Sequence, residues 1–136
     1  ISSEINIVVT LPNADSMNME YRKIMLKLKN IYPDRFTLVE NFGKEKYFSA
    51  IANSELMLGN SSSGILEAAT FKRYVLNVGK RQKGRLKNEN VFDIPFDADL
   101  IYEKYKLILK LGDYRGENIF FKKNTSNNII KVLASG

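Results

Sequence analysis

Short apolar runs alternate with stretches of helical periodicity along this chain, and that alternation restricts the folds it can adopt. Residues 5–11 read Ile-Asn-Ile-Val-Val-Thr-Leu, a near-continuous apolar run typical of a strand covered on both faces. The order of strands and helices predicts βαβ units with right-handed crossovers, and therefore a doubly wound parallel α/β sheet of the Rossmann-like kind. Further strands are predicted at 36–40, 55–59, 74–78 and, at a sheet edge, 91–94. Helices are predicted at about 17–31, 44–53, 63–71 and 100–109, with a short final helix at 129–133.

Composition excludes several kinds of site. The chain has 136 residues, which suggests a single domain, and it contains neither cysteine nor histidine. It therefore has no disulfide, no thiolate metal site and no Ser-His arrangement of its own, and the commonest general base is missing. The net charge of +6 favours an anionic partner. On charge alone, nucleic acid, acidic lipid and phosphorylated metabolites all remain open.

The start of the chain carries no targeting signal. It begins at Ile1 without an initiator methionine, a basic segment or the apolar core of a signal peptide. No apolar run approaches the roughly 20 residues that span a bilayer. We therefore expect a soluble, cytoplasmic protein, and a strand so close to residue 1 suggests a piece of a longer chain.

Three polar segments follow predicted strands: residues 12–15 (Pro-Asn-Ala-Asp), 59–64 and 79–85. In open α/β sheets, ligands bind beyond the carboxyl ends of the strands, and all three segments belong to that edge. Their coincidence is the main indication of a binding site. Within the first segment, Asp15 is expected to cap the following helix, whereas Asn13 is a candidate for facing the substrate.

The second segment, Gly-Asn-Ser-Ser-Ser-Gly, leads from a strand into a helix. Free N–H groups at a helix start favour phosphate, and small residues with hydroxyl groups let it approach the backbone. The alternative is that Ser62 or Ser63 only caps the helix, although one cap does not require three serines. Glu67 cannot complete a capping box, because Gly64 stands three residues before it. One interpretation is that its carboxylate accepts hydrogen bonds from ribose hydroxyls. The alternative is that it lies on a solvated face, where the helix dipole favours a negative charge.

The third segment begins a basic loop, residues 79–87, with five cations in nine positions. A solvated charged loop is the usual meaning of such a run. A pyrophosphate clamp also needs glycines and arginine forks, and this loop supplies them beside the serine-rich turn. Nucleic-acid binding is less favoured, because the cations are confined to one loop and no RNA-binding aromatic motif is present. The cations are Lys80, Arg81, Lys83, Arg85 and Lys87.

Taken together, the three segments resemble the C-terminal domain of the hydrolysing UDP-N-acetylglucosamine 2-epimerases. The resemblance covers about residues 5–101 and keeps the order and spacing of all three motifs. The non-hydrolysing epimerases share the fold but typically carry an Asp-Ser-Gly-Gly turn at this place and lack the Arg-Gln-x-Gly-Arg loop. The motifs therefore favour the hydrolysing branch, which makes N-acetylmannosamine for sialic-acid and related surface-polysaccharide pathways.

The resemblance implies one half of a two-domain glycosyltransferase-B architecture, with the ligand between two Rossmann-like halves. In such enzymes the C-terminal half mainly holds the UDP. Carried over by position, Ser61 and Ser62 would bind the phosphates, Glu67 the ribose and Arg81 the diphosphate. The remaining implied UDP-binding residues are Ser63 and Gly64 in the same turn, Asn13 along the cleft, and Phe42 and Gly43 as a backbone contact to uracil.

The family reaction removes the C2 proton of the sugar and expels UDP, and water then adds to a glycal-type intermediate. The acid/base carboxylates and a histidine belong largely to the N-terminal half, so the resemblance implies that this chain alone binds nucleotide weakly and catalyses nothing. It implies no metal or other cofactor, no nucleic acid and no membrane. The implied partners are UDP or UDP-N-acetylglucosamine, the N-terminal domain and, at full length, further copies in a homo-oligomer. A donor domain of a true glycosyltransferase, and a basic nucleic-acid-binding module, remain as alternatives.

Overall fold

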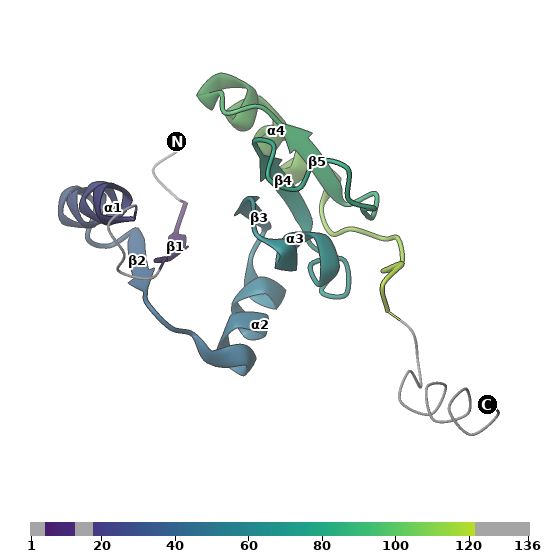
Figure 1. Cartoon of the computed structure of the whole chain (residues 1–136), viewed down its shortest axis with the longest axis horizontal. Helices are drawn as coiled ribbons and strands as arrows, with labels where there is room; N and C mark the ends of the chain where they lie inside the picture. Colours follow the sequence, from purple (N-terminus) through teal and green to yellow (C-terminus); the bar gives the residue numbers. More distant parts are fainter. Residues whose placement is uncertain (1–4, 13–17, 122–136) are drawn as a thin grey trace. The chain divides into compact units, whose positions relative to one another are not determined.

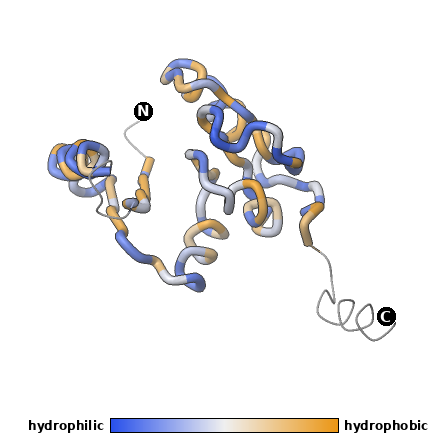
Figure 2. Tube along the Cα trace, viewed as in Figure 1, coloured by the Kyte–Doolittle hydropathy of each residue, from blue (hydrophilic) through white to orange (hydrophobic). Residues whose placement is uncertain are grey.

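The computed structural model describes residues 5–12 and 18–121. Strands and helices alternate through these residues, except that the last two strands follow one another directly, and every strand pairing is parallel, which confirms the predicted α/β class (Figure 1). Figure 2 shows hydrophobic and hydrophilic residues interleaved along the helices. The strands are β1 (Ile7–Thr10), β2 (Phe36–Val39), β3 (Leu56–Gly59), β4 (Tyr74–Val78) and β5 (Val91–Ile94). The helices are α1 (Met19–Ile31), α2 (Gly43–Asn53), α3 (Ser62–Leu66) and α4 (Ala98–Leu111).

The chain divides into two compact units, residues 1–49 and 50–136. In the first unit, β1 pairs with β2 from Ile7 opposite Phe36 onward, and α1 packs on β2. Arg22 of α1 donates to the Pro12 carbonyl at 2.9 Å and forms an ion pair with Glu40. These contacts tie the helix to the residues that follow both strands.

In the second unit, β3, β4 and β5 form a three-stranded sheet in chain order. The predicted strands therefore hydrogen-bond in two sheets, β1-β2 and β3-β4-β5, rather than in one. Leu76 of the central strand β4 packs with Ile94 of β5 and Ile108 of α4. Because side chains alternate along a strand, Val75 lies on the opposite face, where it meets Gly64 of α3. Helices thus cover both faces of β4, as a doubly wound arrangement requires.

Two helices, α3 and α4, differ most from those predicted. Helix α4 begins at Ala98 because the Asp97 carboxylate accepts the Leu100 N–H at 3.0 Å and caps it. Helix α3 ends at Leu66, although the chain continues in helical turns to Lys72, a left-handed residue with φ of 60°. The Arg73 N–H then bonds the Ala68 carbonyl, and the Lys72 N–H that of Ala69, the pattern of a Schellman cap. The helix predicted at 129–133 lies outside the described residues.

Candidate functional site

The serine-rich turn lies between the carboxyl end of β3 and α3. Ser61, not Ser62 or Ser63, is the N-cap of α3: its Oγ lies 3.4 Å from the Ser63 N–H and 3.0 Å from the Ser63 hydroxyl. The Ser62 side chain is exposed and has no hydrogen-bond partner among residues 5–12 and 18–121. One serine therefore suffices for the cap, and the Ser62 hydroxyl remains available to a ligand.

Gly64 is the point at which this turn approaches the sheet. A Cβ atom there would lie 2.9 Å from Cγ1 of the buried Val75, which is closer than packed carbon atoms come. The Gly64 N–H donates to the Ser61 carbonyl at 3.3 Å. Gly64 therefore supports the site by letting α3 pack tightly on β4. Its own N–H is already used by the hydrogen bond to Ser61.

Glu67 follows the last residue of α3, and was predicted to lie inside a longer helix. Its N–H donates to the Ser63 carbonyl at 2.9 Å, and the residue is half-buried. Its carboxylate makes no hydrogen bond or ion pair with any residue in the described part of the chain. Glu67 is the C-cap of α3, at the negative end of the helix dipole, so the dipole does not favour this carboxylate and its acceptor capacity is free.

The basic loop after β4 lies against the serine-rich turn, as the parallel order of β3 and β4 predicts. Gln82 is only 3% exposed, and its Nε2 donates to the Asn60 carbonyl at 2.8 Å. Arg81 reaches the Asn60 side chain at 3.5 Å, a long contact that leaves most guanidinium donors uncommitted. Sequence analysis missed both Asn60 and Gln82. The available signal was an amide side chain in each of two loops that follow neighbouring parallel strands.

The cations of the basic loop fall into two groups. Lys80, Lys83 and Arg85 are exposed, and their side chains have no ion-pair or hydrogen-bond partner within residues 5–12 and 18–121. Lys87 differs, because its Nζ lies 2.5 Å from Oδ2 of Asp93 on β5, and its side chain is only 16% exposed. The expectation of a uniformly solvated loop is therefore wrong for Lys87, which cross-links the loop to the sheet.

Asp93 also accepts a hydrogen bond from the buried Asn77 at 2.6 Å. Burial raises the pKa of the Asp93 carboxyl, but the hydrogen bonds from Lys87 and Asn77 and the Lys87 charge lower it. The net result is a pKa below the ordinary value of 3.8. The charged carboxylate of Asp93 therefore anchors the loop cation Lys87.

Two further predicted contacts lie in the other compact unit. Phe42 and Gly43 belong to the unit of residues 1–49, where the Phe42 ring packs on Tyr47. The Gly43 N–H already donates to the Asn41 side chain at 2.9 Å. Asn13 lies outside the described residues, as does the Asp15 cap.

The described residues also bear on metals and membranes. Within 5–12 and 18–121, no cluster of three or more histidine, cysteine, aspartate or glutamate side chains is arranged to hold a metal ion. In the same residues, each helix falls short of the length and apolar character needed to cross a membrane.

Comparison with known proteins identifies the family to which this geometry belongs. Residues 1–134 match the family model described as UDP-N-acetylglucosamine 2-epimerase. The chain belongs to this family. The resemblance inferred from the three polar segments is thereby confirmed at the level of the family, and the α/β fold agrees with it.

The relatives of this epimerase-family chain are bacterial. It is 30% identical over 133 residues to the hydrolysing UDP-N,N'-diacetylbacillosamine 2-epimerase of Legionella pneumophila, matching 98% of this chain and 35% of that protein. It is 36% identical over 100 residues to the hydrolysing GDP/UDP-N,N'-diacetylbacillosamine 2-epimerase of Campylobacter jejuni, matching 73% of this chain and 26% of that protein. It is 29% identical over 107 residues to the polysialic acid biosynthesis protein P7 of Escherichia coli. The chain therefore spans about a third or less of the length of these relatives.

Proposed function

We propose that this chain is the UDP-binding half of a hydrolysing UDP-N-acetylglucosamine 2-epimerase, which releases UDP and N-acetylmannosamine. The observation that carries the proposal is the meeting of the serine-rich turn and the basic loop at Asn60, through Gln82 at 2.8 Å and Arg81 at 3.5 Å. Hydroxyl donors and uncommitted cations face one short stretch of the sheet's carboxyl edge. That combination suits a diphosphate.

Each proposed contact follows from an unused group. The Ser62 hydroxyl and the Arg81 guanidinium supply donors for phosphate oxygens, and the Glu67 carboxylate supplies an acceptor for ribose hydroxyls. Expulsion of UDP places additional negative charge on the leaving phosphate. Arg81, aided by the exposed Lys80, would stabilise that charge where it develops.

The acid/base chemistry is proposed to reside elsewhere in the full-length enzyme. This chain has no histidine, and proton removal from the sugar needs a base with a suitable pKa near the reacting carbon. We therefore propose that the N-terminal domain supplies these groups, that the isolated chain is inactive, and that the complete enzyme works in the cytoplasm as a homo-oligomer.

A second sugar is favoured by the relatives. Two of them are described as acting on UDP-N,N'-diacetylbacillosamine, and a third as a polysialic acid biosynthesis protein. The nucleotide contacts proposed above are common to both substrates. Assay of the full-length enzyme with each UDP-sugar, following UDP release, distinguishes them through the ratio of kcat/KM values.

Calorimetric titration with UDP, ADP and a short oligonucleotide tests the site. We expect UDP to bind, and Glu67→Ala to weaken that binding about tenfold, because one charge-assisted hydrogen bond to ribose is lost. Lys83→Ala is the matched control, since Lys83 is exposed on the same edge and lies outside the proposed contacts. Equal losses for the two variants, or binding of the oligonucleotide without UDP, would contradict the proposal in favour of a basic nucleic-acid-binding module.

A further inference from the structure

Gln82 makes one side-chain hydrogen bond and leaves one polar atom unused. Its Nε2 donates to the Asn60 carbonyl, while its Oε1 is buried and has no partner among the described residues. The orientation is determined by chemistry, because a carbonyl oxygen only accepts and the amide must therefore turn its NH₂ group toward Asn60. The buried Oε1 is the consequence.

Local stability does not explain this residue. A buried amide oxygen without a partner costs about 1–3 kcal/mol, and an apolar side chain of the same length would fill the position without that cost. What the glutamine adds is one link between the basic loop and the serine-rich turn. That link joins the residue after Arg81 to the residue before Ser61.

Backbone hydrogen bonds hold the loop around Arg81 in turns, from the Lys83 N–H to the Lys80 carbonyl at 3.0 Å and from the Arg85 N–H to the Gln82 carbonyl at 3.3 Å. Lys83 and Arg85 are exposed, and Gly84 has a φ of +81°, a left-handed conformation that other residues rarely adopt. The Arg81 contact to Asn60 is 3.5 Å, at the limit of a hydrogen bond. The Gln82 bond is the stronger of the two contacts that tie this turn to Asn60, and it is therefore the tether that holds the Arg81 backbone beside the serine-rich turn.

We propose that Gln82 is a positioning residue, whose bond to the Asn60 carbonyl holds Arg81 within reach of an anion at the Ser61-Ser62 turn. The effect on nucleotide affinity rests on the proposed function, whereas the hydrogen bond between Gln82 and Asn60 does not. It predicts that the effect of Gln82 on nucleotide affinity passes through Arg81.

The tether is tested without nucleotide, by amide hydrogen exchange of the chain carrying Gln82→Met. We expect exchange in residues 80–85 to become about tenfold faster, because the loop loses its hydrogen bond to Asn60, with β4 amides unchanged. Removal of the unpartnered Oε1 offsets the hydrogen bond lost to the Asn60 carbonyl, so thermal stability is expected to change little. Unchanged exchange in the loop would overturn the tether. Gln82→Leu repeats the test if the methionine variant fails to fold.

The positioning role is tested by a double-mutant cycle read out as UDP affinity. Gln82→Met should weaken UDP binding about tenfold in the native chain and less than twofold in the Arg81→Met chain. Equal losses in both backgrounds would show that Gln82 does not act through Arg81 and would overturn the role. Affinity unchanged in the native background would overturn it as well. Absence of UDP binding by the native chain would instead refute the proposed function, while loop exchange would still decide the tether.

Discussion

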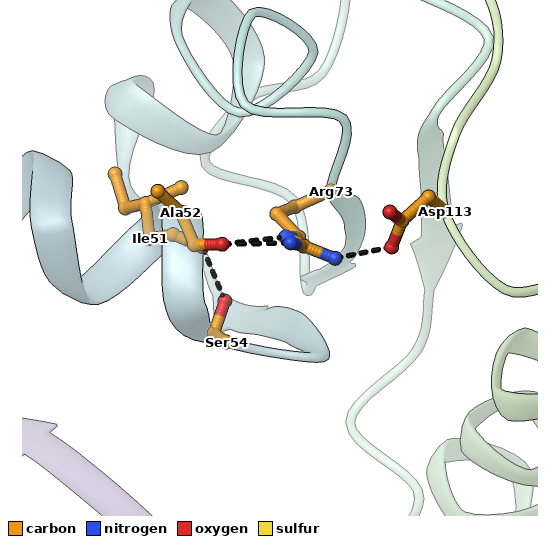
Figure 3. Close-up of polar contacts among 5 residues, drawn as sticks. All are labelled: Ile51, Ala52, Ser54, Arg73 and Asp113. Carbon is orange, nitrogen blue, oxygen red and sulfur yellow. Dashed lines mark hydrogen bonds and ion pairs between the residues drawn. The ribbon is translucent and has the colours of Figure 1, made fainter.

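The two ends of the β3-β4-β5 sheet differ in whether their charged side chains have partners within the fold. At the amino end, Arg73 precedes β4, and its Nε and Nη2 donate to the Ala52 carbonyl at 3.1 and 2.7 Å (Figure 3). Its Nη1 pairs with Asp113, which follows α4. The Arg73 carbonyl accepts from the buried Asn90 side chain at 2.7 Å. Here a single cation joins three separate segments.

At the carboxyl end, the cations of the basic loop are exposed, apart from the paired Lys87. Lys80, Lys83 and Arg85 have no side-chain partner within residues 5–12 and 18–121, and Arg81 has one long contact. Exposed cations confined to one edge repel one another, which is unfavourable unless an anion binds there. The amino end therefore stabilises the fold, and the carboxyl end is where an anionic ligand would bind. This division agrees with the general location of ligands on open α/β sheets.

The largest effect is expected at the amino end. Arg73→Met should lower the free energy of unfolding by about 3 kcal/mol, because it leaves the Ala52 carbonyl unpaired and removes the ion pair with Asp113. Urea denaturation followed by circular dichroism measures this loss. Asp113→Ala is the control and should cost less, since the two bonds to Ala52 remain. If Arg73→Met lowered the free energy of unfolding by less than about 0.5 kcal/mol, the contrast between the two ends of the sheet would be wrong.

The matching change at the carboxyl end is Arg81→Met. It should weaken UDP binding about tenfold while changing the free energy of unfolding by less than about 0.5 kcal/mol, because Arg81 makes no close contact within the fold. Titration calorimetry and urea denaturation of the same sample provide the two values. A large loss of stability with unchanged affinity would reverse the roles assigned to the two ends.

The smallest effect concerns Lys87, the loop cation that is paired. Lys87→Met should lower the unfolding free energy by about 1 kcal/mol at neutral pH, because Asp93 loses its ion-pair partner. The folded-state pKa of Asp93 is depressed, so its contribution is present above the ordinary value of 3.8 and is lost as the pH falls through the folded pKa.

The difference in stability between the native chain and Lys87→Met should therefore narrow below about pH 4. Urea denaturation across an acid series measures it, with Lys83→Met as an equal change of charge at an unpaired position. A gap that stays constant through this range would mean that the Lys87–Asp93 pair contributes nothing.

Local patterns predicted the strands well and one helix poorly. Residues 74–78 and 91–94 were predicted with the bounds that the structure shows, because short apolar runs between turn signals identify buried strands. Helix α3 was predicted to reach residue 71 but ends at Leu66, although Glu67, Ala68 and Ala69 favour helix, so packing on β4 rather than propensity decides its course. Propensity alone does not contain that packing.

Only part of the candidate site was predicted, because the sequence shows which loops share a sheet edge but not which side chains make contact there. Sequence analysis brought Ser61, Ser62 and Arg81 to one edge, because the carboxyl ends of parallel strands share an edge. It grouped Lys87 with the solvated cations, since the pairing with Asp93 depends on how the end of the loop folds back along β5. It also overlooked Gln82, whose bond to Asn60 spans 22 residues.

The sequence by itself determined the parallel α/β class, the placing of the serine-rich turn and the basic loop after neighbouring strands, and the family. These depend on residue type and spacing, which the chain carries locally. Only the tertiary structure decided which charged and polar groups are engaged: Arg73 and Lys87 in the fold, Gln82 in a tether, and Glu67 and Arg81 largely free. The physical reason is that a hydrogen bond or ion pair depends on distances of a few ångströms between residues far apart in the chain, and packing alone sets those distances.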